Sequence, residues 1–246
     1  MTDGPTAADS LAPAAGGTLD PAAGGTLDPA ELRDVPMAWP VSSRHLVGEG
    51  AVFDLVRDQV VDPTGADLRR EWIRHPGAVG VIALDDADRV VLVRQYRHPA
   101  GLRLVEPPAG LLDVDGEDYL AAAQRELAEE VGLRADDWRV LVDMFTSPGA
   151  SQESIRIYLA RDLHEEPLPD GFVADGEEAQ MDVVRAGFQD VIEAVLDGRL
   201  QNPVLIAGVM AAAAARPGGW DRLRPADAPW PARGLRDEFL ARAPFA

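Results

Sequence analysis

The chain of 246 residues contains no cysteine. This absence excludes disulfide bonds, thiolate metal ligands and a cysteine nucleophile, and it fits a cytoplasmic protein. No apolar run reaches the length of a transmembrane helix, and the N-terminus lacks the basic and apolar regions of a secretory signal. We therefore expect a soluble cytoplasmic protein without membrane contact. Histidine is scarce and lacks the spacing of metal ligands, so we expect ordinary polar roles for His45, His75, His98 and His164.

Positively charged residues are also few. Lys and Arg together number 23 against 42 Asp and Glu, which gives a formal net charge of −19. This balance argues against a nucleic-acid-binding protein, because binding to phosphates requires a basic surface. If the substrate is itself an anion, divalent cations and a few local arginines must reverse the field inside the site.

Composition divides the chain into four predicted parts. Residues 1–41 are rich in Ala, Gly and Pro and repeat the octapeptide PAAGGTLD, so we expect a disordered tail. Residues 42–76 are expected to form an N-terminal β-sheet used for dimerisation, residues 77–215 the catalytic domain, and residues 216–246 a C-terminal tail.

Within these parts, hydrophobic periodicity and turn residues predict the individual elements. The segment Asp62-Pro63-Thr64-Gly65 predicts a turn between two strands of the N-terminal sheet, and Asp85–Asp88 predicts a hairpin between two mostly apolar strands. The predicted strands cover residues 52–61, 68–74, 78–84, 90–95, 138–145 and 154–160, and the predicted helices cover residues 116–131, 189–196 and 203–215.

The predicted helix 116–131 carries an unusual group of acids. Asp115 is placed to cap its N-terminus, acidic residues fill its first turn, and Gly132 is placed to end it. At about 100° per residue, an apolar stripe lies beside an arc of carboxylates. The stripe contains Leu120, Ala123, Leu127 and Val131, and the arc contains Glu126, Glu129 and Glu130.

Two interpretations of this acidic arc are open. Most charge runs are solvated helix faces, and the arc on its own fits that description. However, Glu126 and Glu130 are like charges four residues apart and repel each other, while the nearby Arg125 reaches Glu129. A cluster of carboxylates suits a hard divalent cation, so the second interpretation is a site for Mg²⁺, with Mn²⁺ as an alternative.

Residues 125–133, RELAEEVGL, together with Glu117, resemble the Nudix box, G-x5-E-x7-R-E-U-x-E-E-x-G-U, in which U is aliphatic. One departure stands at its start, because Gly110 precedes Glu117 by one residue more than the motif allows. The resemblance implies an α+β Nudix fold, with a mixed β-sheet sandwiched between helices and a small N-terminal antiparallel sheet. It covers roughly residues 43–215.

Further residues resemble the ADP-ribose pyrophosphatase branch of this family, in an actinobacterial-like form. They are Pro148, fifteen residues beyond the box, and the segments 95–97 (QYR) and 108–110 (PAG). The resemblance implies hydrolysis of the diphosphate bond of ADP-ribose to AMP and ribose 5-phosphate. It also implies a homodimer in which the N-terminal sheets exchange.

The resemblance assigns roles to particular residues. Glu126 and Glu130 would be the primary metal ligands, Glu129 would lie close by, the backbone carbonyl of Ala109 would be a further donor, and Arg125 would orient the carboxylates. Glu178 would be the general base, with Glu177 in reserve. Arg97 and Arg103 would contact the diphosphate, although either arginine could instead pair with a surface carboxylate. Glu106 and Glu153 are further candidates for the substrate site, near the metals, and adenine would stack on Trp72 of the same or a partner subunit.

Other functions compete with this one. A Nudix enzyme of this kind would also suit another nucleoside diphosphate derivative, such as a nucleotide sugar, NADH or a dinucleoside polyphosphate. An alternative from a different functional class is a non-catalytic ADP-ribose sensor. Such sensors often carry degraded Nudix boxes, whereas the acidic residues of the box are intact here. An acidic scaffold without a small ligand would require the carboxylate arc to be accidental.

Overall fold

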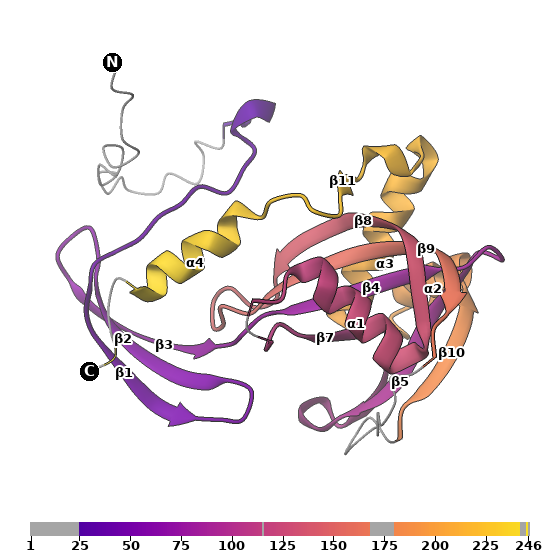
Figure 1. Cartoon of the computed structure of the whole chain (residues 1–246). Helices are drawn as coiled ribbons and strands as arrows, with labels where there is room; N and C mark the ends of the chain where they lie inside the picture. Colours follow the sequence, from indigo (N-terminus) through magenta and orange to yellow (C-terminus); the bar gives the residue numbers. More distant parts are fainter. Residues whose placement is uncertain (1–24, 115, 168–179, 242–244, 246) are drawn as a thin grey trace, which may run out of the picture. The chain divides into compact units, whose positions relative to one another are not determined.

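The computed structural model describes residues 25–114, 116–167, 180–241 and 245. The chain divides into two compact units (Figure 1). The first unit comprises Met1–Ile73 and Pro231–Ala246, and the second comprises Arg74–Trp230. The second unit thus begins close to the predicted boundary at residue 77, and the predicted tail 216–246 contributes to both units.

In the first unit, three strands form a small sheet in the order β1-β2-β3. β1 and β2 are antiparallel. The predicted turn before β3 forms, because the Asp62 carboxylate accepts from the backbone N–H groups of Thr64 and Ala66, and Gly65 adopts a φ of 86°. The described elements of this unit are η1 (Pro29–Glu31), β1 (Val41–Glu49), β2 (Asp54–Val61), β3 (Asp67–Arg74) and α4 (Pro231–Ala241).

A buried arginine joins α4 to this sheet. The guanidinium of Arg44 on β1 is fully buried and donates to both carboxylate oxygens of Asp58 on β2, at 2.8 Å each. Its third nitrogen donates to the backbone carbonyl of Leu240 at 3.2 Å, and its charge lies 4.9 Å from the ring of Phe239. The C-terminal helix therefore belongs to the core of the N-terminal sheet.

The second unit is built on a mixed sheet with the strand order β10-β5-β4-β9-β8-β11, to which β6 adds beside β5 and β7 beside β4. β4 runs parallel to β9, whereas its pairings with β5 and β7 are antiparallel. The strands are β4 (Ala78–Leu84), β5 (Arg89–Arg97), β6 (Leu102–Glu106), β7 (Ala109–Leu111), β8 (Leu133–Phe145), β9 (Ser154–Glu165), β10 (Asp182–Gly187) and β11 (Arg224–Pro225).

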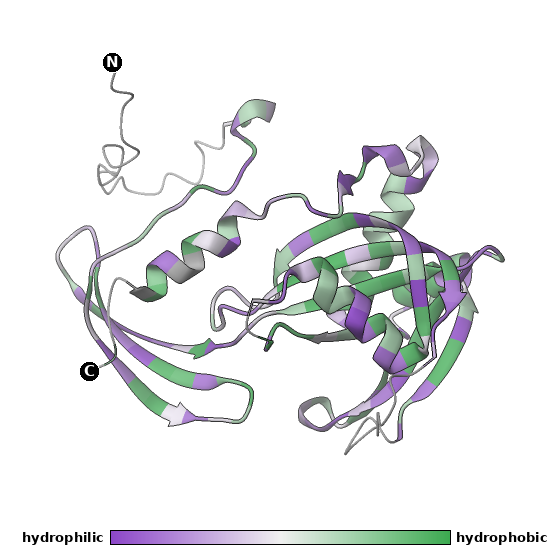
Figure 2. Ribbon diagram, in the orientation of Figure 1, coloured by the Kyte–Doolittle hydropathy of each residue, from purple (hydrophilic) through white to green (hydrophobic). Residues whose placement is uncertain are grey.

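Helices cover both faces of this sheet, as predicted (Figure 1). One apolar cluster joins α1 (Tyr119–Val131) to one face, and a second cluster joins α2 (Phe188–Leu196) and α3 (Pro203–Ala215) to the other. β4 lies between the two clusters and is buried along its whole length, which explains its continuous apolar sequence. Figure 2 shows this concentration of hydrophobic residues along the central strands. The short helices η2 (His98–Ala100), η4 (Arg216–Gly218) and η5 (Trp220–Arg222) complete the unit.

The start of α1 differs from the prediction. The helix begins at Tyr119 rather than Gly116, and its N-cap is Asp118, whose carboxylate accepts from the Ala121 N–H at 2.8 Å. The reason is that Gly116 has a φ of 79°, which a helix cannot include. The first turn therefore contains no acidic residue, contrary to expectation. Gly132 ends the helix in the left-handed conformation, as predicted.

The structure contains more and longer strands than the sequence predicts. Four strands are not predicted at all, namely β1, β6, β7 and β10, while β8 begins earlier and β9 ends later than predicted. β6 and β7 are short and only half-buried, so they lack the apolar alternation on which a prediction depends. Among the helices of the described chain, none is both long and apolar enough to cross a membrane.

Candidate active site on helix α1

Helix α1 buries one side and presents carboxylates beside it. Ala123 and Leu127 are buried against the sheet, and Leu120 and Val131 pack partly buried beside them, which confirms the predicted stripe; Ala122 is buried as well. The side chains of Glu126 and Glu129 are 12% and 29% exposed, so both lie at the margin of the core. Carboxylates in such a position are partly desolvated and remain accessible to a ligand.

Arg125 binds several of these carboxylates at once. Its Nε and Nη2 each donate to one oxygen of Glu117 at 2.9 Å, and its Nη1 donates to Glu126 at 2.6 Å and to Glu129 at 3.3 Å. The bidentate bond lowers the pKa of Glu117, because it stabilises the carboxylate. The same bond to Glu117 raises the pKa of Arg125 further above its usual range. Arg125 therefore connects Glu117, which precedes the helix, to Glu126 and Glu129 on it.

Strand β7 contacts two of the carboxylates of α1. Gly110 lies against the carboxylate of Glu126 so closely that a Cβ at this position would overlap its Cδ and both oxygens. The N–H of the neighbouring Ala109 donates to Glu130 Oε2 at 2.9 Å. The extra residue between Gly110 and Glu117 therefore does not separate the glycine from the helix. It is accommodated in the segment that follows Leu111, the last residue of β7.

The donor set suits a hard divalent cation. Glu117, Glu126 and Glu129 accept hydrogen bonds from Arg125, and Glu130 accepts one from the Ala109 N–H. Carboxylate oxygens are ligands that Mg²⁺ prefers. Within the part of the chain that the structure describes, no group of three His, Asp or Glu side chains already stands in a metal-binding arrangement.

The predicted arginines both pair with carboxylates. Arg97 on β5 forms a bidentate pair with Glu106 on β6, with a shortest distance of 2.7 Å, and Glu106 is 2% exposed. Arg103 donates to Asp182 at 2.8 Å, and this carboxylate also accepts from Arg94 at the same distance. Arg94 and Asp182 were not predicted, because only the pairing of β10 with β5 brings them together. The side chains of Arg94 and Arg103 are 46% and 48% exposed, so an anionic ligand would compete easily for them.

The other predicted residues are distributed over the chain. Glu153, between β8 and β9, accepts from the Thr146 hydroxyl at 2.5 Å and lies 3.6 Å from His75 Nε2. Trp72 belongs to the first unit, where its indole N–H donates to Asp58 at 3.1 Å. Glu177 and Glu178, the two candidates for the general base, lie outside the described residues.

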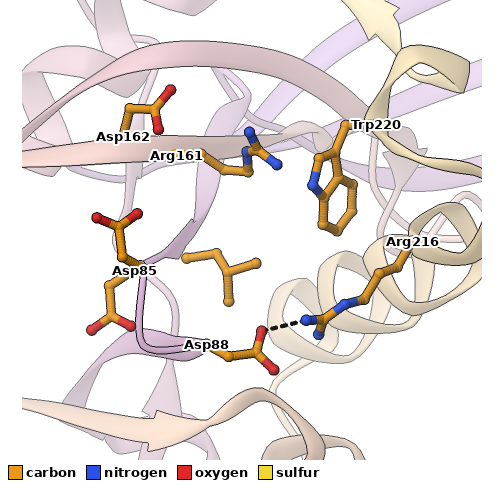
Figure 3. A pocket seen from close by; sticks show the side chains of 8 residues that line it. Asp85, Asp88, Arg161, Asp162, Arg216 and Trp220 are labelled. Atoms are coloured by element: carbon orange, nitrogen blue, oxygen red, sulfur yellow. Dashed lines mark hydrogen bonds and ion pairs between the residues drawn. The ribbon is translucent and has the colours of Figure 1, made fainter.

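A separate pocket of about 290 Å³ lies at the turn between β4 and β5 (Figure 3). None of its lining residues comes from α1. Arg216 pairs with Asp88 at 2.7 Å, and Arg161 stacks on the indole of Trp220. Arg161 also pairs with Asp137, and Asp85 with Arg89, both outside the lining. We assign this pocket no function. Its lining comprises Leu84, Asp85, Asp86, Asp88, Arg161, Asp162, Arg216 and Trp220.

Several glutamates gathered on one helix beside a mixed sheet form a donor set suited to a divalent metal ion. Residues 74–201 match the family model described as the NUDIX domain. The chain therefore belongs to the Nudix family and is a Nudix hydrolase. Enzymes of this family generally use a divalent metal ion.

Similar proteins agree with this assignment. The chain is 47% identical over 181 residues to the ADP-ribose pyrophosphatase of Mycobacterium tuberculosis, a match that covers 74% of this chain and 86% of the relative. It is 40% identical to the methanol dehydrogenase activator of Bacillus methanolicus, covering 62% and 76% of the two chains. A solved structure of an ADP compounds hydrolase superposes with a TM-score of 0.62 at 22% identity, covering 76% of this chain and 99% of that one, and so shares the fold.

Proposed function

We propose that the protein hydrolyses the diphosphate bond of ADP-ribose, in a metal-dependent reaction, to AMP and ribose 5-phosphate. The observation that carries this proposal is the complete glutamate cluster of α1, held by Arg125 and by the backbone of β7. The substrate is suggested by the ADP-ribose pyrophosphatase of M. tuberculosis, which shares nearly half of its aligned residues with this chain.

The metal would be held by Glu126 and Glu130, with Glu129 close by and the backbone carbonyl of Ala109 as a further donor. Mg²⁺ is the expected ion and Mn²⁺ the alternative, because both take oxygen ligands. When bound, such an ion neutralises charge on the phosphate oxygens and makes water more acidic. Gly110 supports the proposal, since the absence of a side chain there lets Glu126 lie against β7.

The remaining predicted residues would act on substrate and water. Arg97 and Arg103 would contact the diphosphate, with Glu106 and Glu153 nearby, and Glu106 would keep Arg97 oriented through their bidentate pair. Glu178, or Glu177 in its place, would take a proton from the attacking water. Trp72 would stack against adenine if the ring leaves its present contacts with Asp58 and Phe239.

We further propose a homodimer formed through the N-terminal sheet, in the cytoplasm. A group of apolar side chains around the β1–β2 hairpin is 38–51% exposed, and exposed apolar groups of this kind are typical of protein interfaces. The group consists of Leu46, Val47, Val52, Phe53 and Leu55. The oligomeric state can be measured by analytical ultracentrifugation, and a monomer at micromolar concentration would contradict this part of the proposal.

The central test is hydrolysis of ADP-ribose with Mg²⁺, followed by chromatography of AMP. Glu126→Gln and Glu130→Gln are each expected to lower kcat/KM by at least about 100-fold, because each removes a ligand charge. Glu193→Gln on α2 is the matched control and should retain the wild-type rate. Activity of both ligand variants within a few-fold of wild type would disprove the metal assignment.

The general base requires its own test. Glu178→Gln is expected to lower kcat by about 100-fold or more while substrate still binds. If Glu177→Gln alone produces this loss, the role belongs to Glu177.

A substrate panel separates the neighbouring functions. ADP-ribose, a nucleotide sugar, NADH and a dinucleoside polyphosphate should be compared by kcat/KM, and ADP-ribose is expected to be highest. A higher value for another compound would reassign the substrate within the family. Tight binding of ADP-ribose without turnover would instead identify a sensor.

A further inference from the structure

A buried arginine on the sheet lies between two aromatic rings, one of which begins helix α1. Arg156 on β9 is 2% exposed. Its guanidinium carbon lies 5.0 Å from the ring of Tyr119 and 5.5 Å from the ring of Trp230, and the two rings are 5.8 Å apart. Cation–π attraction is strongest when, as here, the charge is removed from water.

The hydrogen bonds of the same guanidinium connect it to the end of the second unit. Nε and Nη2 donate to the two oxygens of Asp143 on β8 at 2.7 and 2.9 Å, and Nη1 donates to the backbone carbonyl of Ala228 at 2.7 Å. Asp143 also accepts from Arg224 at 2.7 Å. Although burial opposes the charge on Arg156, the bond to Asp143 more than compensates, and its pKa is raised. Arg156 thus attaches residues 224–230 to the sheet.

This segment reaches the acidic cluster through the first turn of α1. Tyr119 is the first residue of the helix and directly follows its N-cap, Asp118. Glu117 precedes the cap and holds Arg125 with two bonds of 2.9 Å, and Arg125 in turn holds Glu126. Ordered contacts therefore run from Trp230 and Arg156 through the start of the helix to the carboxylates.

We propose that Arg156 and Trp230 are positioning residues for the metal-binding carboxylates. They fix the start of α1, and so keep Glu117 and Arg125 where they orient Glu126 and Glu129. This inference rests on the proposed metal-dependent function. Its first step, that Arg156 and Trp230 order the start of α1, concerns the protein alone and can be measured without metal or substrate. Changing a group that orients metal ligands typically costs about 10–100-fold in metal affinity or activity.

The test compares two tryptophans in similar surroundings. Trp230→Ala removes a half-buried ring beside Arg156, and Trp220→Ala removes a half-buried ring that lies 5.5 Å from Arg161 on the opposite face of the sheet. Arg156→Lys is the second variant, because it keeps the charge but cannot form the same three hydrogen bonds. Each full-length variant is measured by amide hydrogen exchange and by its Mg²⁺ and ADP-ribose dependence.

Trp230→Ala is expected to accelerate exchange at the amides of Ala121 and Ala122, which bond to the N-cap, without accelerating exchange in α3. It should also raise the Mg²⁺ concentration for half-maximal activity about tenfold, while KM for ADP-ribose changes less than about twofold. Arg156→Lys should change the same quantities, and Trp220→Ala should change neither.

Two results would overturn the inference. One is unchanged exchange at Ala121 and Ala122 in a folded Trp230→Ala protein, and the other is an equal change in both tryptophan variants. If the wild type shows no metal-dependent hydrolysis, the proposed function fails first. The exchange comparison then still decides whether Trp230 orders the start of α1.

Discussion

Both carboxylate oxygens of Glu117 accept from the guanidinium of Arg125, each at 2.9 Å. The two residues are eight positions apart, and Glu117 lies before the helix that contains Arg125. The pair therefore joins the loop to the helix, and it leaves Arg125 Nη1 to bind Glu126 and Glu129.

Replacing this arginine by lysine should separate charge from geometry. Arg125→Lys retains the positive charge but cannot bind Glu117 through two parallel bonds while also holding Glu126. We expect the Mg²⁺ concentration for half-maximal activity to rise about tenfold, as for other groups that orient metal ligands. The measurement is initial rate against Mg²⁺. Arg134→Lys, in an exposed pair with Asp136, is the control; an equally small effect of both changes would contradict the orienting role.

The pH dependence of stability should report the same pair. Because the pKa of Glu117 is lowered in the folded state, its contribution to the free energy of unfolding is present above its unfolded pKa of about 4.3 and is lost as pH falls through the lower, folded value. Wild type should therefore exceed Glu117→Gln in Tm at pH 7, and the difference should shrink below about pH 4. Glu165→Gln, on the exposed end of β9, should show no such trend. A difference in Tm that is constant with pH would refute this explanation.

Gly110 should tolerate no side chain. Gly110→Ala would place a Cβ against the carboxylate of Glu126, so the glutamate or β7 must move. We expect kcat/KM to fall by about tenfold or more, because ligand groups must be held within about 0.5 Å of their productive positions. Gly149→Ala is a suitable control, since a Cβ at that position meets no atom within 4 Å. Equal kcat/KM for the two alanine variants would show that the close approach is unimportant.

Arg44 should dominate the stability of the first unit. Arg44→Ala leaves the carboxylate of Asp58 buried without its main partner, which typically costs about 3–5 kcal/mol. By contrast, Arg57 and Glu71 form a pair on the same sheet with side chains 41% and 42% exposed, and Arg57→Ala should cost about 0–1 kcal/mol. Urea unfolding of both variants gives the comparison. Similar losses in the two proteins would mean that Arg44 does not hold this core together.

The sequence predicted those features that depend on local pattern. The hairpin of β4 and β5 followed from two apolar runs around Asp85–Asp88, and the C-terminus of α1 followed from Gly132. The arc of glutamates followed from helical periodicity and from the resemblance to the Nudix box. In each case, the residues that determine the structure are close together in the chain.

Features that depend on distant partners were missed. Strand β7 has three residues and forms only because β4 pairs with it, and the contact between Gly110 and Glu126 follows from that pairing. The bond between Arg44 and the carbonyl of Leu240 joins residues 196 positions apart. The start of α1 was misplaced because a left-handed Gly116 cannot be distinguished in the sequence from a helical one.

The composition of the first unit has a consequence for biosynthesis. Its sheet is made from residues 41–74, yet α4, whose Leu240 carbonyl binds Arg44, is translated only after the whole second unit. Since domains generally fold as units while the chain emerges from the ribosome, the Nudix unit can fold first. The bond between Arg44 and Leu240 can then form only after α4 has been translated. A nascent chain stalled before residue 231 should therefore resist protease across residues 74–215 while remaining sensitive across residues 41–73.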